Sequence, residues 1–340
     1  MAKRTKGFSK GTVAVIITSL LICLLFAALL ILNVFIPLKY FTSYAVRAHK
    51  NEEGDMRVTF IDVGFGESIL VELPDGKNML IDGGNGAYRN NLSLLEAVNR
   101  RGVKVIDYLI CTSVKDEHCA GLAEIVKYKT VKKAFVPYVN NTRITDEYHS
   151  FISAVNKKNI PTEAACVNAG GEGDGYFFTF LSPSDYRSPL SEYAVLNAEP
   201  TNANIDGASA MVWLEYRGTS FAFVSDARAD TFKRVVEDYK LCEALGTPYC
   251  AFGGHSVVLT ECDIVSVACH GGEANTYAPW YDLVKPKEAV VSVGENYSSY
   301  PSATALSDVC QYAQPLYTMY DGNIMFIVNR DGYTVLKEKK

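Results

Sequence analysis

The chain has 340 residues, of which 48% are hydrophobic and 21% charged, as is usual for a folded globular protein. Its formal net charge is −5, so no strong overall basic field points to nucleic-acid binding, although this number does not exclude a local basic patch. Beyond roughly the first fifty residues, the remaining length fits one large domain or two small ones.

The N-terminal segment differs in composition from the rest of the chain. Residues 1–10 include four lysine or arginine side chains, whereas residues 11–38 include no charged side chain. About 20 apolar residues cross the bilayer core, and the apolar core of a cleaved signal peptide is usually shorter, at about 7–15 residues. We therefore predict a single transmembrane helix at 11–38 that binds the lipid bilayer, with a cleaved signal peptide as the alternative.

The positive-inside rule places a basic tail in the cytoplasm. Residues 1–10 are therefore expected there, in a single-pass protein of the cell membrane whose globular part is extracellular. Residues 39–55 are expected to be a linker, and residues 56–340 the folded domain. An extracellular domain permits disulfides. Of the nine cysteines, Cys242 and Cys250 flank a Gly-Thr-Pro turn and are a candidate pair, with buried free thiols as the alternative.

Strand and helix patterns alternate along the domain, which favours an α/β or α+β layered fold. Residues 186–206 are expected to form a loop. The expected strands are 57–62, 69–73, 78–81, 108–111, 134–139, 177–181, 208–216, 219–224, 264–268, 288–293, 322–328 and 333–336. The expected helices are 91–101, 120–126, 146–157, 230–239, 281–284 and 302–312.

The pattern of segment 107–122 is typical of a buried strand, a polar loop and the start of a helix. The polar loop carries Ser113, Lys115, Glu117 and His118. Layered α/β folds place their chemistry at such strand ends. This loop is therefore the first candidate for a functional site.

Six blocks resemble, in the same order, the metallo-β-lactamase-fold domain of ComEC-type DNA-uptake competence proteins. The resemblance implies an α+β fold, a metallo-β-lactamase-like four-layer αββα sandwich, preceded here by the N-terminal transmembrane helix. It also implies a metal site at one edge, between two mixed sheets. The blocks are residues 60–70, 80–84, 107–122, 223–227, 267–271 and 290–295.

The family's metal motif resembles His-x-(His/Asp)-x-Asp-His, and this chain has Ser113, Lys115, Glu117 and His118 at those positions. The first two ligands are lost, so the first of two metal sites is expected to be absent. Lys115 places a cation where a cation would bind and can fill that position electrostatically. A later His-Pro of the family is replaced by Tyr300-Pro301.

The second half of the motif is better preserved. The resemblance implies four metal ligands, Glu117, His118, Asp226 and His270, and catalytic roles for Asp226, His118 and Lys115. Carboxylates and imidazoles are suitable ligands for one zinc or manganese ion. Such a site lowers the pKa of water and supports hydrolysis of an ester or phosphodiester.

Two functional hypotheses follow from this pattern. The first is a membrane-anchored, ComEC-like protein that is a degenerate or mononuclear metal-dependent hydrolase of the phosphodiester or nucleic-acid type. The alternative is a catalytically inactive extracellular binding or scaffold domain that holds no metal. In that case Lys115, Glu117 and Asp226 form a charge network, and Lys115 contacts an anionic ligand.

A third, minor hypothesis concerns three cysteines near the expected site. Cys111, Cys119 and Cys269 would form a thiolate-rich metal site or a disulfide there.

Overall fold

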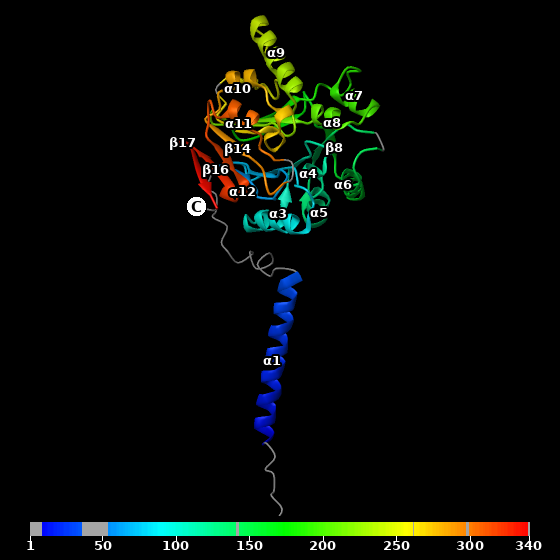
Figure 1. Cartoon of the computed structure of the whole chain (residues 1–340), viewed down its shortest axis with the longest axis vertical. Helices are drawn as coiled ribbons and strands as arrows, with labels where there is room; N and C mark the ends of the chain where they lie inside the picture. The colour runs from blue at the N-terminus through cyan, green and yellow to red at the C-terminus, as the bar shows by residue number, and fades with distance from the viewer. Residues whose placement is uncertain (1–8, 36–53, 141–142, 261, 297–298, 339–340) are drawn as a thin grey trace, which may run out of the picture. The chain divides into compact units, whose positions relative to one another are not determined.

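The computed structural model describes residues 9–35, 54–140, 143–260, 262–296 and 299–338 (Figure 1). Most of the expected basic tail and nearly all of the expected linker at 39–55 lie outside these ranges. The chain folds into two separate compact units, Met1–Arg47 and Ala48–Lys340.

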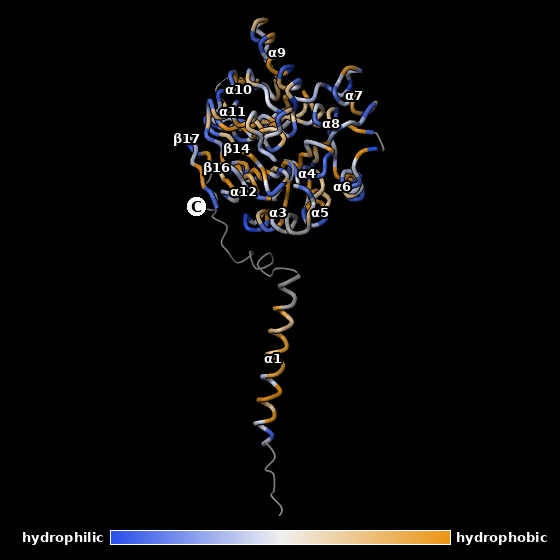
Figure 2. Tube along the Cα trace, in the orientation of Figure 1, coloured by the Kyte–Doolittle hydropathy of each residue, from blue (hydrophilic) through white to orange (hydrophobic). Residues whose placement is uncertain are grey.

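The first unit contains one long apolar helix, α1 (Lys10–Phe35, 26 residues). Its segment Lys10–Leu30 has a mean hydropathy of 3.0, and none of it is buried within the protein. Figure 2 shows hydrophobic residues along most of this helix. By length and composition α1 can cross a membrane, as predicted, with the last residues of the predicted span outside the described part of the chain.

The second unit is built on two large mixed sheets. The first has the order β17-β16-β1-β2-β3-β5-β7-β8, and the second the order β15-β14-β13-β12-β11-β10-β9. The strands of the first sheet are β1 (Met56–Phe60), β2 (Ile69–Glu72), β3 (Asn78–Ile81), β5 (Tyr108–Ile110), β7 (Ala134–Val136), β8 (Thr162–Ala164), β16 (Ile324–Asn329) and β17 (Gly332–Lys337). Those of the second are β9 (Gly170–Glu172), β10 (Tyr176–Ser182), β11 (Met211–Tyr216), β12 (Thr219–Phe223), β13 (Ile264–Ser266), β14 (Glu288–Val291) and β15 (Pro315–Tyr317).

The remaining elements lie between these strands. A small parallel pair joins β4 (Val105–Ile106) and β6 (Thr130–Val131). The α-helices are α3 (Tyr88–Arg100), α4 (Asp116–Cys119), α5 (Leu122–Tyr128), α6 (Asp146–Lys157), α7 (Glu192–Ala198), α8 (Asn202–Gly207), α9 (Ala229–Leu245), α10 (Ala278–Val284), α11 (Ala303–Val309) and α12 (Thr318–Asp321). Two short 3₁₀ turns are η2 (Ala268–Gly271) and η3 (Glu273–Asn275).

The alternation of side chains along the strands sets the layers. In β10, Phe178 and Phe180 join the core between the two sheets, while Phe177 and Leu181 join the core beneath α9, α10 and α11. In β3, Leu80 joins a third core with α3, α5 and α6. Successive strand residues point to opposite faces, so three cores separate four layers. The predicted αββα sandwich is confirmed.

Parallel strands of both sheets bring their carboxyl ends to the same region. In the first sheet β3, β5 and β7 are parallel neighbours, and in the second β12, β13 and β14 are parallel neighbours. The Thr112 hydroxyl, two residues after β5, contacts the Ser225 hydroxyl, two residues after β12, at 2.6 Å. The loops that follow these strands therefore meet at the carboxyl ends of the two sheets. Layered α/β folds place their functional sites at such strand ends.

The predicted loop at 186–206 is wrong, because this segment contains α7 and α8. Each helix begins with a side-chain cap: Ser191 Oγ accepts from Ala194 N and Thr201 Oγ1 accepts from Asn204 N, both at 3.2 Å. Such caps satisfy backbone donors that a helix start leaves unpaired. Each helix is shorter than two full turns. The helical spacing of apolar residues is too short at that length to be recognised in the sequence.

The candidate pair Cys242 and Cys250 does not form a disulfide, and the alternative of free thiols is the one observed. All nine cysteines lie in the described ranges and are free thiols. The helix predicted to end at Tyr239 continues to Leu245 as α9, so Cys242 lies within its last turn. The turn expected to join the two cysteines therefore begins only after the helix.

Replacing Phe223 by alanine is expected to lower the free energy of unfolding by about 3–5 kcal/mol. The Phe223 ring is buried between the sheets, 5.9 Å from Phe60 and 5.8 Å from Phe221 between centroids. Denaturant unfolding of the detergent-purified chain measures this loss. The control is Leu190→Ala, because Leu190 is 88% exposed and surface changes usually stay within about 0.5 kcal/mol. Equal losses in both variants would contradict the assigned core.

Candidate metal site

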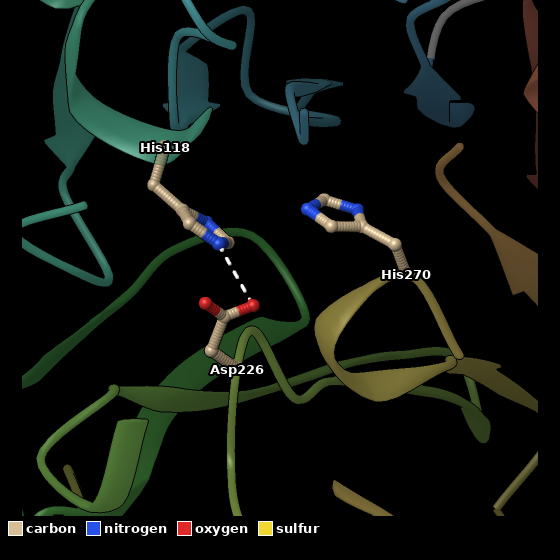
Figure 3. A group of neighbouring side chains, drawn as sticks. All are labelled: His118, Asp226 and His270. Carbon is tan, nitrogen blue, oxygen red and sulfur yellow. Dashed lines mark ion pairs between the residues drawn. The ribbon is translucent and has the colours of Figure 1, made fainter. Parts of the chain in front are cut away.

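Three buried side chains converge where the strand ends meet. His118 lies in α4 beyond β5 of the first sheet, whereas Asp226 follows β12 and His270 lies in η2 after β13 of the second sheet. Their exposed fractions are 1%, 0% and 3%. One ligand atom from each lies within 4.8 Å of the others, and Figure 3 shows the three side chains pointing toward one another.

The backbone around two of these residues is unusual. Ser225, Cys269 and His270 have φ values of 49°, 46° and 55°. This left-handed region is uncommon for residues with a side chain and concentrates at functional sites. The loops after β12 and β13 thus hold a costly conformation that aims Asp226 and His270 at His118.

A buried carboxylate fixes the orientation of His118. His118 Nδ1 lies 2.7 Å from Asp82 Oδ2. Asp82 also accepts hydrogen bonds from Thr112 N at 2.8 Å and Thr112 Oγ1 at 2.5 Å. Carboxylates beneath metal-binding histidines have this role, since they set the tautomer and the ring orientation. The other nitrogen of His118 is consequently directed at Asp226.

His270 is oriented in a similar way by the main chain. Its Nδ1 donates to the Ser292 carbonyl at 2.6 Å, which leaves Nε2 facing the site. Burial lowers the pKa of His270, against the opposing effect of the Asp226 carboxylate. The imidazole is therefore neutral at neutral pH, the form that binds a metal.

Asp226 and His118 form a strongly charged pair. Burial alone would raise the pKa of Asp226, but His118 and Lys115 hold it well below its usual range. Burial alone would lower the pKa of His118, but Asp226 and Asp82 raise it well above its usual range. A metal ion that binds here thus displaces a proton from His118, so its affinity falls at low pH.

Three candidate ligand atoms of this group face one another: His118 Nε2, Asp226 Oδ1 and His270 Nε2. The first two form an ion pair at 3.0 Å, whereas His270 Nε2 has no hydrogen-bond partner. Buried polar atoms are nearly always satisfied, so the unpaired His270 Nε2 beside this ion pair requires an explanation. Two imidazole nitrogens and a carboxylate oxygen are a suitable donor set for zinc or manganese. The residues present therefore fit one metal ion.

The structure does not bring the other two predicted site residues into this group. Lys115 Nζ lies 2.9 Å from Asp226 Oδ2, whereas His118 faces the other carboxylate oxygen. The Glu117 carboxylate lies 3.8 Å from Lys115 Nζ and belongs to neither group of candidate ligands among the described residues. The predicted ligand set thus differs from the observed group by Glu117.

Two acidic residues near the site were not predicted. Asp206 of α8 pairs with Lys115 at 2.5 Å. The sequence did not point to Asp206, because its segment was expected to be a loop. Glu67 is buried beside Asp82 and His118, with which it forms a second group of candidate ligands. Burial raises the pKa of Glu67 to about 8, against the lowering effect of His118. Asp82 already accepts hydrogen bonds from Thr112 and lies against His118. We therefore interpret the second group as residues that hold His118 in place, not as a second metal site.

The three cysteines named in the sequence do not join either group of candidate ligands in the described part of the chain. Burial raises the pKa of Cys111, Cys119 and Cys269 above the usual range of a thiol. All three remain protonated, uncharged thiols, whereas a metal-binding cysteine is a thiolate.

No family model matches the chain. ComE operon protein 3 of Bacillus subtilis (strain 168) is 23% identical over 262 residues, which cover 72% of this chain and 29% of that protein. This chain resembles a ComEC-type protein. The match confirms the resemblance inferred from the six sequence blocks, and it means that the chain spans less than a third of the length of this ComEC-type relative.

Several solved structures match much of the chain at low sequence identity. The metallo-β-lactamase fold protein YhfI from Bacillus subtilis is 10% identical with a TM-score of 0.49, over 80% of this chain and 99% of that one. A diphosphatase from the PhnP family is 15% identical with a TM-score of 0.42, over 80% and 98% of the two chains. A long form RNase Z from yeast is 13% identical with a TM-score of 0.42, over 84% and 43%.

Replacing Asp82 by asparagine is expected to weaken metal binding by about 10–100-fold, because His118 loses the carboxylate that orients it. Competition with a chelating indicator measures the dissociation constant. The matched control is Asp75→Asn, since Asp75 lies in the exposed turn after β2 and pairs with Lys77. An unchanged constant in Asp82→Asn would show that His118 is not a ligand.

Proposed function

We propose that this ComEC-like chain is a membrane-anchored hydrolase that uses a single metal ion to cleave phosphodiester bonds in nucleic acid or a related anionic substrate. The observation that supports the proposal is the convergence of three buried ligand atoms on His118, Asp226 and His270, with His270 Nε2 left without a hydrogen-bond partner. Three protein ligands leave a fourth position open in a tetrahedral site, the pattern of catalytic rather than structural zinc.

The chain's own residues have separate tasks in this proposal. His118, Asp226 and His270 hold the ion, Asp82 orients His118, and the Ser292 carbonyl orients His270. When bound, such an ion supplies Lewis acidity that activates water and polarises a phosphoryl oxygen. The low exposure of the three ligands strengthens electrostatic interactions with the substrate's developing charge.

The substrate class rests on the resemblance to ComEC-type DNA-uptake proteins, which favours nucleic acid. The charge of Lys115 does not add to this, because Asp206, Asp226 and Glu117 already surround its ammonium.

The detergent-purified full chain is expected to contain one zinc or manganese ion per molecule and to hydrolyse bis(p-nitrophenyl) phosphate. His270→Ala and Asp226→Ala remove a ligand, so metal content and hydrolysis both fall, the latter by more than about 100-fold. Metal analysis and the release of nitrophenolate measure the two. The matched control is His149→Ala, because His149 is exposed on α6. A metal-free natural chain whose stability does not respond to chelators would contradict the proposal.

A second candidate function is the inactive binding or scaffold domain. Its support is the Lys115 ammonium, which lies 2.5 Å from Asp206 Oδ1 and 2.9 Å from Asp226 Oδ2 and partly balances these charges without a metal. Under this alternative the natural chain binds no metal. Introducing Ser113→His, Lys115→His and Tyr300→His together would then create metal binding that the natural chain lacks.

The membrane part of the proposal rests on α1, and its orientation on the basic residues 1–10. We expect a protease added to intact cells to digest the unit containing residues 54–340 while a cytoplasmic marker stays whole. Immunoblotting against an epitope within this unit measures the digestion. Protection of the unit until detergent is added would show that it lies inside the cell.

A further inference from the structure

The Lys115 ammonium lies among three carboxylates. Its Nζ is 2.5 Å from Asp206 Oδ1, 2.9 Å from Asp226 Oδ2 and 3.8 Å from Glu117 Oε1. The exposed side-chain fractions are 16% for Lys115, 11% for Asp206, 23% for Glu117 and 0% for Asp226. These four residues therefore form a largely buried cluster, which we call the lysine cage.

Three carboxylates around one point require a cation. Buried like charges raise one another's free energy unless an opposite charge compensates them. Lys115 supplies this charge, because its ammonium lies within hydrogen-bond distance of Asp206 and Asp226 and close to Glu117. The ammonium is the central cation of the cage.

Asp226 connects the cage to the candidate metal site. Its Oδ2 faces Lys115, while its Oδ1 faces His118 Nε2. One carboxylate thus lies between an ammonium on one side and the metal-ligand group on the other. A carboxylate between two cations is the arrangement expected when two metal ions share a ligand, with the ammonium here in one of the two positions.

We propose that Lys115 is a tethered cation that replaces a second metal ion, and that Asp206 and Glu117 are the residues that hold it there. The centre is then limited to one metal ion per chain by its own side chain. The one-ion stoichiometry rests on the proposed function, whereas the cage itself does not.

The cage also explains two departures from the family motif together. Lysine in place of a ligand supplies the cation. Glutamate in place of aspartate has one more methylene, and its carboxylate lies with Lys115 instead of with His118 and His270. Asp206, contributed by α8, completes the set. Asp206 and Glu117 are therefore positioning residues that act through Lys115.

An ordinary stabilising salt-bridge network is the competing explanation, and metal stoichiometry separates the two. Lys115→Met removes the ammonium and keeps an unbranched side chain that is one atom shorter. The emptied cage is expected to take up a second divalent ion, so the detergent-purified full chain changes from one manganese or zinc ion to two. Lys115→Met with Asp206→Asn is expected to return to one, because a carboxylate of the cage is lost. Lys115→Arg keeps the charge and should remain at one.

The readouts are elemental analysis after equilibration with the metal and, for the cobalt-substituted chain, the visible absorption of a second coordination environment. The matched control is Lys77→Met, because Lys77 is also paired with an aspartate, Asp75, but at the surface. Its metal content should equal that of the natural chain. No gain of an ion in Lys115→Met over the natural chain, or retention of the gained ion after Asp206→Asn is added, would overturn the proposal.

Failure of the proposed function gives a different result from failure of the cage. If the natural chain binds no metal but Lys115→Met binds one, and Asp206→Asn abolishes it, the cage proposal holds and the hydrolase proposal fails. If Lys115→Met is unstable, thermal melting with and without zinc or manganese decides. Restored stability with the metal supports a replaced cation, and no restoration overturns it.

Discussion

The buried carboxylate of Asp226 is the constraint on which the site depends. A charge with no exposed surface is very costly unless other charges and hydrogen bonds compensate it. His118 lies against one of its oxygens and Lys115 against the other. Each of these cations then requires its own partner, which Asp82 provides for His118 and Asp206 for Lys115. The polar network thus extends outward from one charge, and this explains why so many acidic residues lie in a small volume.

The sandwich fold makes this network geometrically feasible. Apolar side chains alternate along the strands and fill three cores, so polar residues are displaced to the strand ends. The ends of β5, β12 and β13 meet at one edge, and each contributes a short loop. Left-handed backbone at Ser225, Cys269 and His270 then turns these loops inward. The stability of the packed cores offsets the cost of this strained backbone.

Most of the fold and half of the site were accessible from the sequence. Strand alternation and the order of six motif blocks predicted the four layers, and the preserved motif residues His118, Asp226 and His270 do lie together. Glu117 was predicted as a ligand because a motif records residue type and position, not the direction that a longer side chain takes. It lies with Lys115 instead.

The predictions that failed did so for a common reason, which is that they depend on contacts between distant segments. Asp206 lies about ninety positions beyond Lys115 along the chain, in a helix too short to show periodicity. Cys242 and Cys250 were a candidate pair because they flank a Gly-Thr-Pro turn, but Cys242 belongs to the last turn of α9 and is a free thiol. Side-chain caps at Ser191 and Thr201 are the signal that could have revealed α7 and α8. Contacts between distant segments require the tertiary fold, which local patterns do not contain.

His118 belongs to one sheet and Asp226 and His270 to the other, so an ion held by all three would join the two sheets at this edge. It would cross-link them much as a disulfide does, in a protein whose nine cysteines are free thiols. Such a cross-link would exist only in the folded domain, so metal would raise the ratio of folded to unfolded protein by a factor that grows with the metal concentration divided by the dissociation constant. The abundance of the intact domain would then follow the supply of metal around it.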